Sequence, residues 1–291
     1  MNALAEHRDN FRAMDTDIDV SIYAAVRPLA AFASVRILFE QQEARFSRFR
    51  PSSLLSSLNR GAVVDDALFA EVCRLALEAS ALTGGLFNPM VLPALEAAGY
   101  DRTFRDVQGG EPSAQLVPRL DECVHVEGNT VQLLAGKLDL GGIVKGWTVD
   151  KAAELLLAEC DAVLINAGGD MRTTGHEPGV DGWHTGVAGP AGGLVWQGLL
   201  DGALATSTVL RRRWATRSGA AAHHLIDPRT GLPAHSSFVQ VSAWATETWL
   251  AECWAKAVLI GGPAAMDMAS GNRVRVLALD SEDGVHGIAV T

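Results

Sequence analysis

The chain has 291 residues, and 48% of them are hydrophobic, which is enough to bury a substantial core in one large domain. Its formal net charge at pH 7 is -10. Nucleic acids and anionic membranes bind basic surfaces, so this charge argues against both as partners. The expected ligand is a small molecule or another protein, and any phosphate on it would need positive charge placed locally.

Two further patterns bear on the compartment. The first residues, MNALAEHRDNF, carry charges where a signal peptide needs an apolar core, and no uninterrupted apolar run approaches the ~20 residues of a membrane helix. The four cysteines are far apart and match no zinc or redox spacing, which favours buried free thiols; they are Cys73, Cys123, Cys160 and Cys253. We therefore expect a cytoplasmic protein.

The first part of the chain predicts a strand followed by three helices. Within residues 11–23, apolar and polar side chains alternate from Ile18 onward, as they do in an edge or hairpin strand. Residues 28–46 have a helical pattern that Pro51 ends, and the serine pair at 52–53 can cap a short second helix. Residues 66–83 place their apolar side chains on one helical face, which predicts a third helix.

The middle of the chain predicts a loop, a hairpin and a strand-turn-helix unit. Residues 102–118 are polar and rich in glycine and proline, so we expect a loop. Residues 123–134 alternate around a Gly-Asn pair, which is typical of a hairpin. Residues 138–140 are interpreted as the end of a strand, and the glycine pair at 141–142 as a tight turn before an amphipathic helix that extends to about Glu159.

The strand-turn-helix unit is a candidate phosphate site. Paired glycines let the backbone reach positive φ and approach a ligand, and the first N–H groups of a helix attract anions. Lys145 follows three residues after Gly142, within reach of a phosphate oxygen, and Asp139 precedes the turn. On these residues alone, an ordinary connection with a solvated lysine is an equally good interpretation.

The last part of the chain predicts strands and one helix. Residues 163–169 form a buried strand followed by Asp170, and residues 184–188 and 195–200 form paired strands. Ser207 could donate to a phosphate, although a structural serine at a turn is the commoner role. We expect a helix over residues 246–260, ended by two glycines, and a hairpin over residues 274–290 that closes the sheet.

Five segments, in this order, are similar to motifs of the ApbE-like flavin transferases, the FAD:protein FMN transferase family. They are SRFRPSSLLSSLN (47–59), LDLGGIVKGWTVD (138–150), LINAGGDMRTTG (164–175), ALATST (203–208) and HLIDPRTGLP (224–233). The resemblance implies an α+β fold, with residues 1–291 forming a single domain of two interlocked lobes, mixed sheets and a flavin in the cleft between the lobes. It implies transfer of FMN from FAD to a Thr or Ser hydroxyl of an acceptor flavoprotein, with release of AMP.

The same resemblance assigns candidate site residues. Asp139, Gly142 and Lys145 would hold the pyrophosphate region of FAD, and Asp170 would lie beside the nucleotide. The other candidate FAD contacts are Met14, Phe49, Phe87, Asn88 and His224. His224 is also a candidate for proton transfer. Met14 as a core methionine and His224 as a structural histidine remain open alternatives.

One departure from the family concerns magnesium. Relatives have A-D-A-L-A-T in the late helix, and its Asp and Thr bind Mg²⁺ together with a backbone carbonyl near the glycine pair, whereas this chain has AECWAK. Glu252 and the Gly142 region could still offer oxygens, but protonated Lys256 has no lone pair and cannot bind a metal. Lys256 could supply the positive charge itself, so Glu252 and Lys256 are candidate catalytic residues.

Three alternatives remain open. A surface Glu252–Lys256 ion pair worth only ~0.2–0.5 kcal/mol would have no catalytic role. The chain could be an FAD-binding protein that has lost transfer, or an FAD pyrophosphatase that uses water as the acceptor.

Overall fold

The computed structural model describes residues 4–157, 159–282 and 284–287 of an α+β protein built around one large antiparallel sheet. The strand order in this sheet is β1-β2-β6-β7-β10-β15-β16-β17. The strands are β1 (Ala5–Ala13), β2 (Thr16–Ala24), β6 (Ala162–Ala167), β7 (Asp170–Thr174), β10 (Ala203–Thr208), β15 (Phe238–Ala245), β16 (Arg275–Asp280) and β17 (Val285–Gly287).

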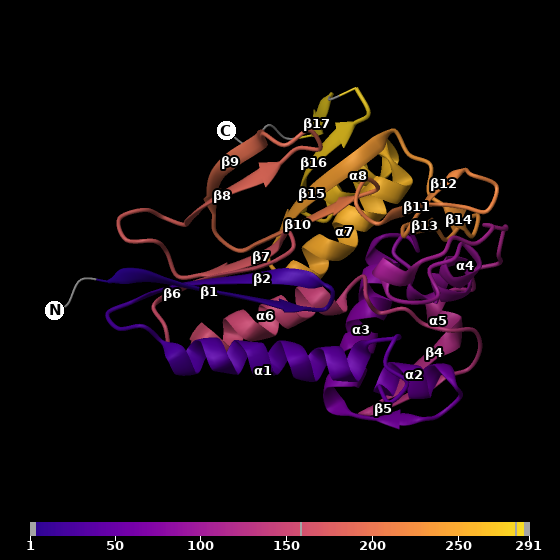
Figure 1. Ribbon diagram of the computed structural model, residues 1–291, viewed down its shortest axis with the longest axis horizontal. Helices are drawn as coiled ribbons and strands as arrows, with labels where there is room; N and C mark the ends of the chain where they lie inside the picture. Colours follow the sequence, from indigo (N-terminus) through magenta and orange to yellow (C-terminus); the bar gives the residue numbers. More distant parts are fainter. Residues whose placement is uncertain (1–3, 158, 283, 288–291) are drawn as a thin grey trace.

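Helices cover one face of this sheet. α6 (Val144–Leu157) packs on β6 and β7, and α7 (Thr248–Gly261) packs on β10 and β15. α1 (Leu29–Phe46) lies against α6, and α8 (Pro263–Gly271) lies against α7 and β16 (Figure 1). Because α6 and α7 also pack against each other, the residues near their N-termini meet beneath the centre of the sheet.

The remaining elements are smaller. A second region contains α2 (Leu54–Asn59), α3 (Ala67–Leu82), α4 (Leu92–Ala97), α5 (Leu120–Cys123) and a sheet in the order β3-β5-β4, made of Val64–Asp65, Thr130–Leu133 and Val124–Glu127. Three strand pairs complete the fold: β8 (Trp183–Ala188) with β9 (Leu194–Leu200), β11 (Arg213–Ala215) with β12 (Ala221–His223), and β13 (Ile226–Asp227) with β14 (Leu232–Pro233). Short 3₁₀ turns cover Pro89–Val91 and Phe104–Asp106.

Most of the predicted elements are confirmed. The helices α1 to α3, the hairpin of β4 and β5, the pairing of β8 with β9, and α7 all lie within a few residues of the predicted bounds. The single strand predicted over residues 11–23 is instead the end of β1, a turn at Met14 and Asp15, and most of β2. Ser53 caps α2 by accepting a hydrogen bond from the Ser56 N–H at 3.0 Å, and Asp66 caps α3 through the Phe69 N–H at 2.8 Å. The C-terminal hairpin is confirmed as far as Gly287, and residues 288–290 of that prediction lie outside the described residues.

The strand predicted over residues 138–140 is wrong. The side-chain amide of Asn59 donates to the Leu138 carbonyl at 2.9 Å and accepts from the Leu138 N–H at 2.8 Å, so a side chain satisfies this backbone instead of a neighbouring strand. Neither Gly141 nor Gly142 has a positive φ, so that part of the prediction is wrong as well. Ser207 lies within β10 and not at a turn.

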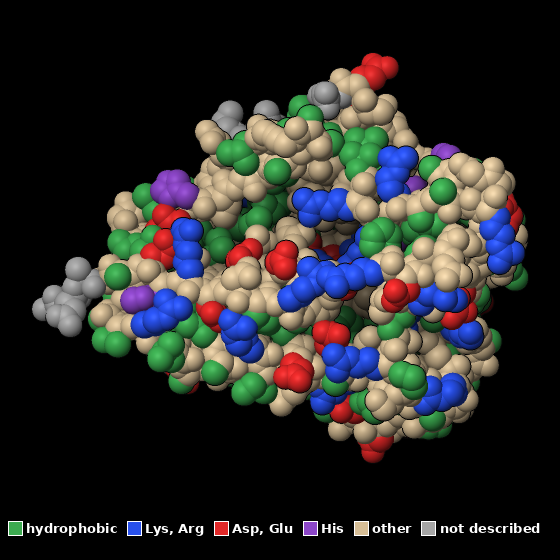
Figure 2. All heavy atoms as spheres, in the orientation of Figure 1, with side chains coloured by type: hydrophobic (Ala, Val, Ile, Leu, Met, Phe, Trp, Pro, Cys, Tyr) green, Lys and Arg blue, Asp and Glu red, His purple; other side chains and the backbone are tan. Residues whose placement is uncertain are grey.

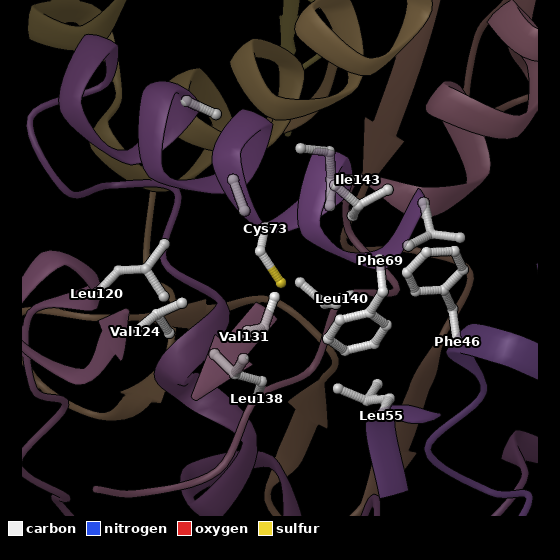
Figure 3. Packing of buried hydrophobic residues seen from close by; sticks show 14 of the residues in the cluster. Phe46, Leu55, Phe69, Cys73, Leu120, Val124, Val131, Leu138, Leu140 and Ile143 are labelled. Atoms are coloured by element: carbon white, nitrogen blue, oxygen red, sulfur yellow. The ribbon is translucent and has the colours of Figure 1, made fainter. Parts of the chain in front are cut away.

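The segment before α6 is held by the apolar core of the second region. Figure 3 shows Leu138, Leu140 and Ile143 among the side chains of this core, which α2, α3 and β5 also supply. Because Leu138 and Leu140 are both buried, the intervening Asp139 faces away from the core. Among the described residues, no helix is both long enough and apolar enough to cross a membrane.

Candidate functional site

Lys145 links the start of α6 to the large sheet. Its Nζ donates to the Ala167 carbonyl at 3.1 Å and forms an ion pair with Asp170 at the start of β7. The other oxygen of Asp170 accepts from the Thr206 N–H at 3.4 Å on β10. Burial lowers the pKa of Lys145 to about 7, with Glu252 opposing this change and Lys256 adding to it. The lysine is therefore not the solvated residue of the ordinary-connection interpretation.

Glu252 and Lys256 form an ion pair on α7 in which Glu252 is buried and Lys256 is partly buried. The Lys256 Nζ lies 2.9 Å from Glu252 Oε1, and Glu252 Oε2 accepts from the Gly146 N–H at 2.8 Å. Glu252 is 2% exposed, so the surface ion pair considered from the sequence is wrong. Burial acts to raise the pKa of Glu252, but Lys256 and Lys145 outweigh it and the net pKa is lowered. The carboxylate is therefore ionised at neutral pH, between two lysines.

Two glycines bring α6 and the turn before it close to α7. A Cβ on Gly142 would lie 3.2 Å from the Phe87 ring and 3.3 Å from the Lys256 side chain. A Cβ on Gly146 would lie 2.8 Å from the Thr248 carbonyl oxygen and 2.9 Å from Glu252 Oε2. Gly142 is thus a neighbour of Lys256, and Gly146 permits the close approach of the helices.

Gly146→Ala is expected to destabilise the protein, because the Thr248 carbonyl is backbone and cannot move aside without shifting α7. Overpacking of this kind typically costs about 1–3 kcal/mol of unfolding free energy. Gly271→Ala is the matched control, since Gly271 ends α8 and a Cβ there would meet no atom within 4 Å. Urea denaturation of both variants checks the prediction, and equal midpoints would contradict the close approach.

The charges of Lys256 and Arg212 also act on His224, whose backbone N–H donates to the Arg212 carbonyl at 3.2 Å. Its Nδ1 is shielded from solvent and has no hydrogen-bond partner among the described residues. Burial, together with the charges of Arg212 and Lys256, holds the pKa of His224 well below its usual value. The imidazole is therefore neutral at pH 7, and a neutral imidazole carries one nitrogen that can accept a proton.

Asp139 is held by an arginine that the sequence analysis did not single out. Arg48 Nε lies 3.1 Å from Asp139 Oδ2, and the Arg48 guanidinium lies 4.1 Å from the centre of the Phe49 ring and 4.6 Å from that of Tyr100. Asp139 also accepts from the Gly141 N–H at 2.8 Å. Arg48 lies within the SRFR segment, where the two arginines beside Phe49 were the available signal. Phe49 thus belongs to an aromatic and arginine stack.

Three other predicted contacts have clear structural roles. Met14 occupies a two-residue turn between β1 and β2 with a φ of 49°, and its N–H donates to Glu43 Oε2 at 2.9 Å. Phe87 is buried in the core of the second region. The Asn88 amide donates to the Pro118 carbonyl at 3.0 Å and its oxygen accepts from the Met90 N–H at 3.0 Å. Asn88 therefore holds the backbone of two neighbouring loops in place.

Charged side chains gather where α6, α7 and β7 meet. Lys145, Asp170, Glu252 and Lys256 are joined by the ion pairs and electrostatic effects described above, and Arg212 and His224 act on the same group. Figure 2 shows Lys and Arg side chains in the middle of the displayed face, around a hollow, with Asp and Glu side chains beside them. Because the protein is acidic, this local group of lysine and arginine charges is the candidate site for a phosphate-bearing ligand.

The donor set of this charged group does not fit a magnesium ion. Mg²⁺ requires several oxygen ligands in octahedral geometry. Both oxygens of Glu252 already accept hydrogen bonds, from Lys256 and from the Gly146 N–H, and Lys256 offers donors only. In the described part of the chain, no group of three or more His, Cys, Asp or Glu side chains could hold a metal.

Comparison with known proteins gives the family. The model of the ApbE family matches residues 14–278, so the chain belongs to the ApbE family. A protein named FAD:protein FMN transferase from Treponema pallidum is 33% identical over 263 residues, covering 80% of this chain and 72% of that protein. Another of that name, from Vibrio cholerae, is 26% identical over 272 residues, covering 84% and 78%.

Solved structures agree on the fold. The crystal structure of the ApbE protein of Thermotoga maritima matches with a TM-score of 0.88 at 22% identity, covering 98% of this chain and 97% of that one. The apo flavinyl transferase ApbE of Pseudomonas stutzeri matches with a TM-score of 0.85 at 19% identity, covering 98% and 95%. These matches confirm the α+β fold class.

Proposed function

We propose that this protein transfers FMN from FAD to a Thr or Ser hydroxyl of an acceptor flavoprotein and releases AMP. The names of its relatives support the reaction. The single observation that carries the proposal to this chain is a pair of partly buried lysines: Lys256 is paired with the ionised Glu252, and the charge of Lys145 acts on the same carboxylate. Phosphoryl transfer depends mainly on positioning and charge neutralisation, which this group supplies.

The reaction can be assigned to residues step by step. The acceptor hydroxyl attacks the FMN phosphorus of FAD, the bond from that phosphorus to the bridging oxygen breaks, and AMP leaves with that oxygen. Lys145 holds the pyrophosphate through the donor that Asp170 and Ala167 leave free, because an ammonium group has three N–H donors. His224 is neutral and is the candidate acceptor of the hydroxyl proton.

Lys256 takes the place of a metal cation in this proposal. The ammonium group lies at a position where relatives offer an oxygen ligand, and it remains beside a carboxylate. Its positive charge would face the reacting phosphorus, while Gly142 keeps the approach to Lys256 open because a larger residue would press on its side chain.

The test is to incubate the purified protein with FAD and candidate acceptor flavoproteins, with magnesium or with a chelator. We expect one AMP to be released for each flavin that becomes covalently bound. The yield should be the same with magnesium and with the chelator. AMP without protein-bound flavin would support the pyrophosphatase alternative. FAD binding without either product would support a binding protein that has lost transfer.

A further inference from the structure

α6 and α7 run antiparallel and cap each other. Glu252 of α7 accepts from the Gly146 N–H, and Asp150 of α6 accepts from the Thr248 N–H at 2.9 Å and the Trp249 N–H at 3.0 Å. The first N–H groups of a helix have no partner inside it, and a carboxylate there also interacts favourably with the helix dipole. Each helix therefore supplies the carboxylate that the other helix needs at its N-terminus.

Asp150 is the principal cap of α7. The residue in the usual capping position, Glu247, makes no capping hydrogen bond, and its carboxylate accepts from the Trp249 indole at 2.8 Å. Asp150 is buried, so water does not compete for its oxygens. The Thr248 hydroxyl donates to the Met171 carbonyl at 3.2 Å, which ties the same helix end to β7.

We propose that Asp150 is a positioning residue that sets the distance between Lys145 on α6 and the Glu252–Lys256 pair on α7. The two carboxylate links lie one helical turn apart, because 146 and 150 on α6 face 252 and 248 on α7. With Gly146 allowing close contact, these links fix both the separation of the helices and their relative slide. Without the Asp150 link, the hydrogen bond from the Gly146 N–H to Glu252 is the remaining carboxylate link between the two helices. Glu252 also pairs with Lys256, so its position would then depend on that ion pair.

A pH effect follows from this position. Burial raises the pKa of Asp150 to about 6, with the Thr248 and Trp249 N–H groups opposing the change. Arg172, whose Nε lies 3.9 Å from Asp150 Oδ1, is the charged side chain that faces it from β7. Above pH 6 both oxygens accept, whereas below it one oxygen carries a proton and faces an N–H donor. Activity should therefore fall as the pH drops through 6.

The test compares Asp150→Ala and Asp150→Asn with Asp66→Ala, a variant that removes the cap of α3, outside this helix pair. The kinetic readout rests on the proposed function. We expect kcat for FMN transfer to fall at least tenfold in Asp150→Ala while the Kd for FAD changes less than threefold. Asp66→Ala should leave both values within twofold of wild type. Asp150→Asn keeps one acceptor, so its kcat should be intermediate and its pH profile should lose the acid limb near 6.

A second readout does not depend on catalysis. The Gly146 amide is in the first turn of α6, and its acceptor is Glu252, so its hydrogen exchange reports the α6–α7 contact. Asp150→Asn should speed this exchange at least tenfold, and Asp66→Ala should not. Unchanged Gly146 exchange in Asp150→Asn, or a wild-type kcat in Asp150→Ala, would overturn the proposal. If the wild-type protein forms no covalent flavin, the proposed function is overturned. The Gly146 exchange measurement then decides by itself whether Asp150 positions the two helices.

Discussion

Lys256→Ala is expected to abolish FMN transfer, with a loss of at least a hundredfold in kcat/KM for FAD. The variant removes the ion-pair partner of the buried Glu252, which keeps the hydrogen bond from the Gly146 N–H and the more distant charge of Lys145. Breaking a buried ion pair by removing one partner also costs about 3–5 kcal/mol of stability. The measurement is AMP release and covalent flavin, together with the melting temperature.

Stability and function can be separated with a second variant. Glu252→Gln with Lys256→Met neutralises both members of the pair at similar volume, and such replacements are often neutral for stability. We expect this double variant to regain the melting temperature but not the transfer activity. Lys151→Ala is the control, since Lys151 is a partly exposed lysine of α6 that pairs with Glu71 and Glu154, and it should transfer normally.

Magnesium provides the decisive comparison for Lys256. Wild-type transfer should not respond to a chelator, because Lys256 and the Gly146 N–H occupy both Glu252 oxygens. Glu252→Asp with Lys256→Thr places two oxygen ligands at the i, i+4 spacing and removes the competing charge, so this variant should require magnesium. A wild-type protein that depends strongly on magnesium would refute the replacement of the metal by Lys256.

Lys145→Ala is expected to weaken FAD binding at least tenfold. A hydrogen bond from a charged donor is worth roughly 1.5–3 kcal/mol, and about 1.4 kcal/mol corresponds to a factor of ten in Kd. The low pKa of Lys145, about 7, leaves it partly neutral in the free protein, and a bound pyrophosphate would favour its charged form. FAD binding should therefore take up a proton near pH 8, which calorimetry in buffers of different ionisation enthalpy can measure.

The loss of Lys145 also leaves the buried Asp170 without its ion-pair partner. A second variant is therefore needed to separate this loss of stability from the loss of FAD binding. Asp170→Asn combined with Lys145→Ala removes that unpaired charge. We expect the double variant to recover stability and to remain weak in FAD binding. Fluorescence titration of FAD gives the affinities. Equal Kd values for the wild type and both variants would show that Lys145 does not bind the pyrophosphate.

The sequence analysis located Lys145, Glu252 and Lys256 but not their environment. The four-residue spacing of Glu252 and Lys256 places them on one helical face, which predicts an ion pair but not whether the pair is exposed or buried. Only the packing of α7 under the sheet, with Glu252 2% exposed, decides between them. Similarly, the ion pair of Arg48 with Asp139 and the effect of the Arg212 charge on His224 depend on how distant segments pack, which no local sequence pattern reports.

By itself, the sequence determined the elements whose signals are local. The serine cap of α2, the hairpin over residues 123–134 and the apolar faces of the helices act within a few residues, so their patterns predicted the structure correctly. The order of five motifs determined the family. The tertiary structure alone decided that residues 138–140 form no strand, because the partner of Leu138 is the side chain of Asn59, 79 residues away. It also decided the mutual capping of α6 and α7, since a carboxylate on one helix can cap another only when packing brings them together.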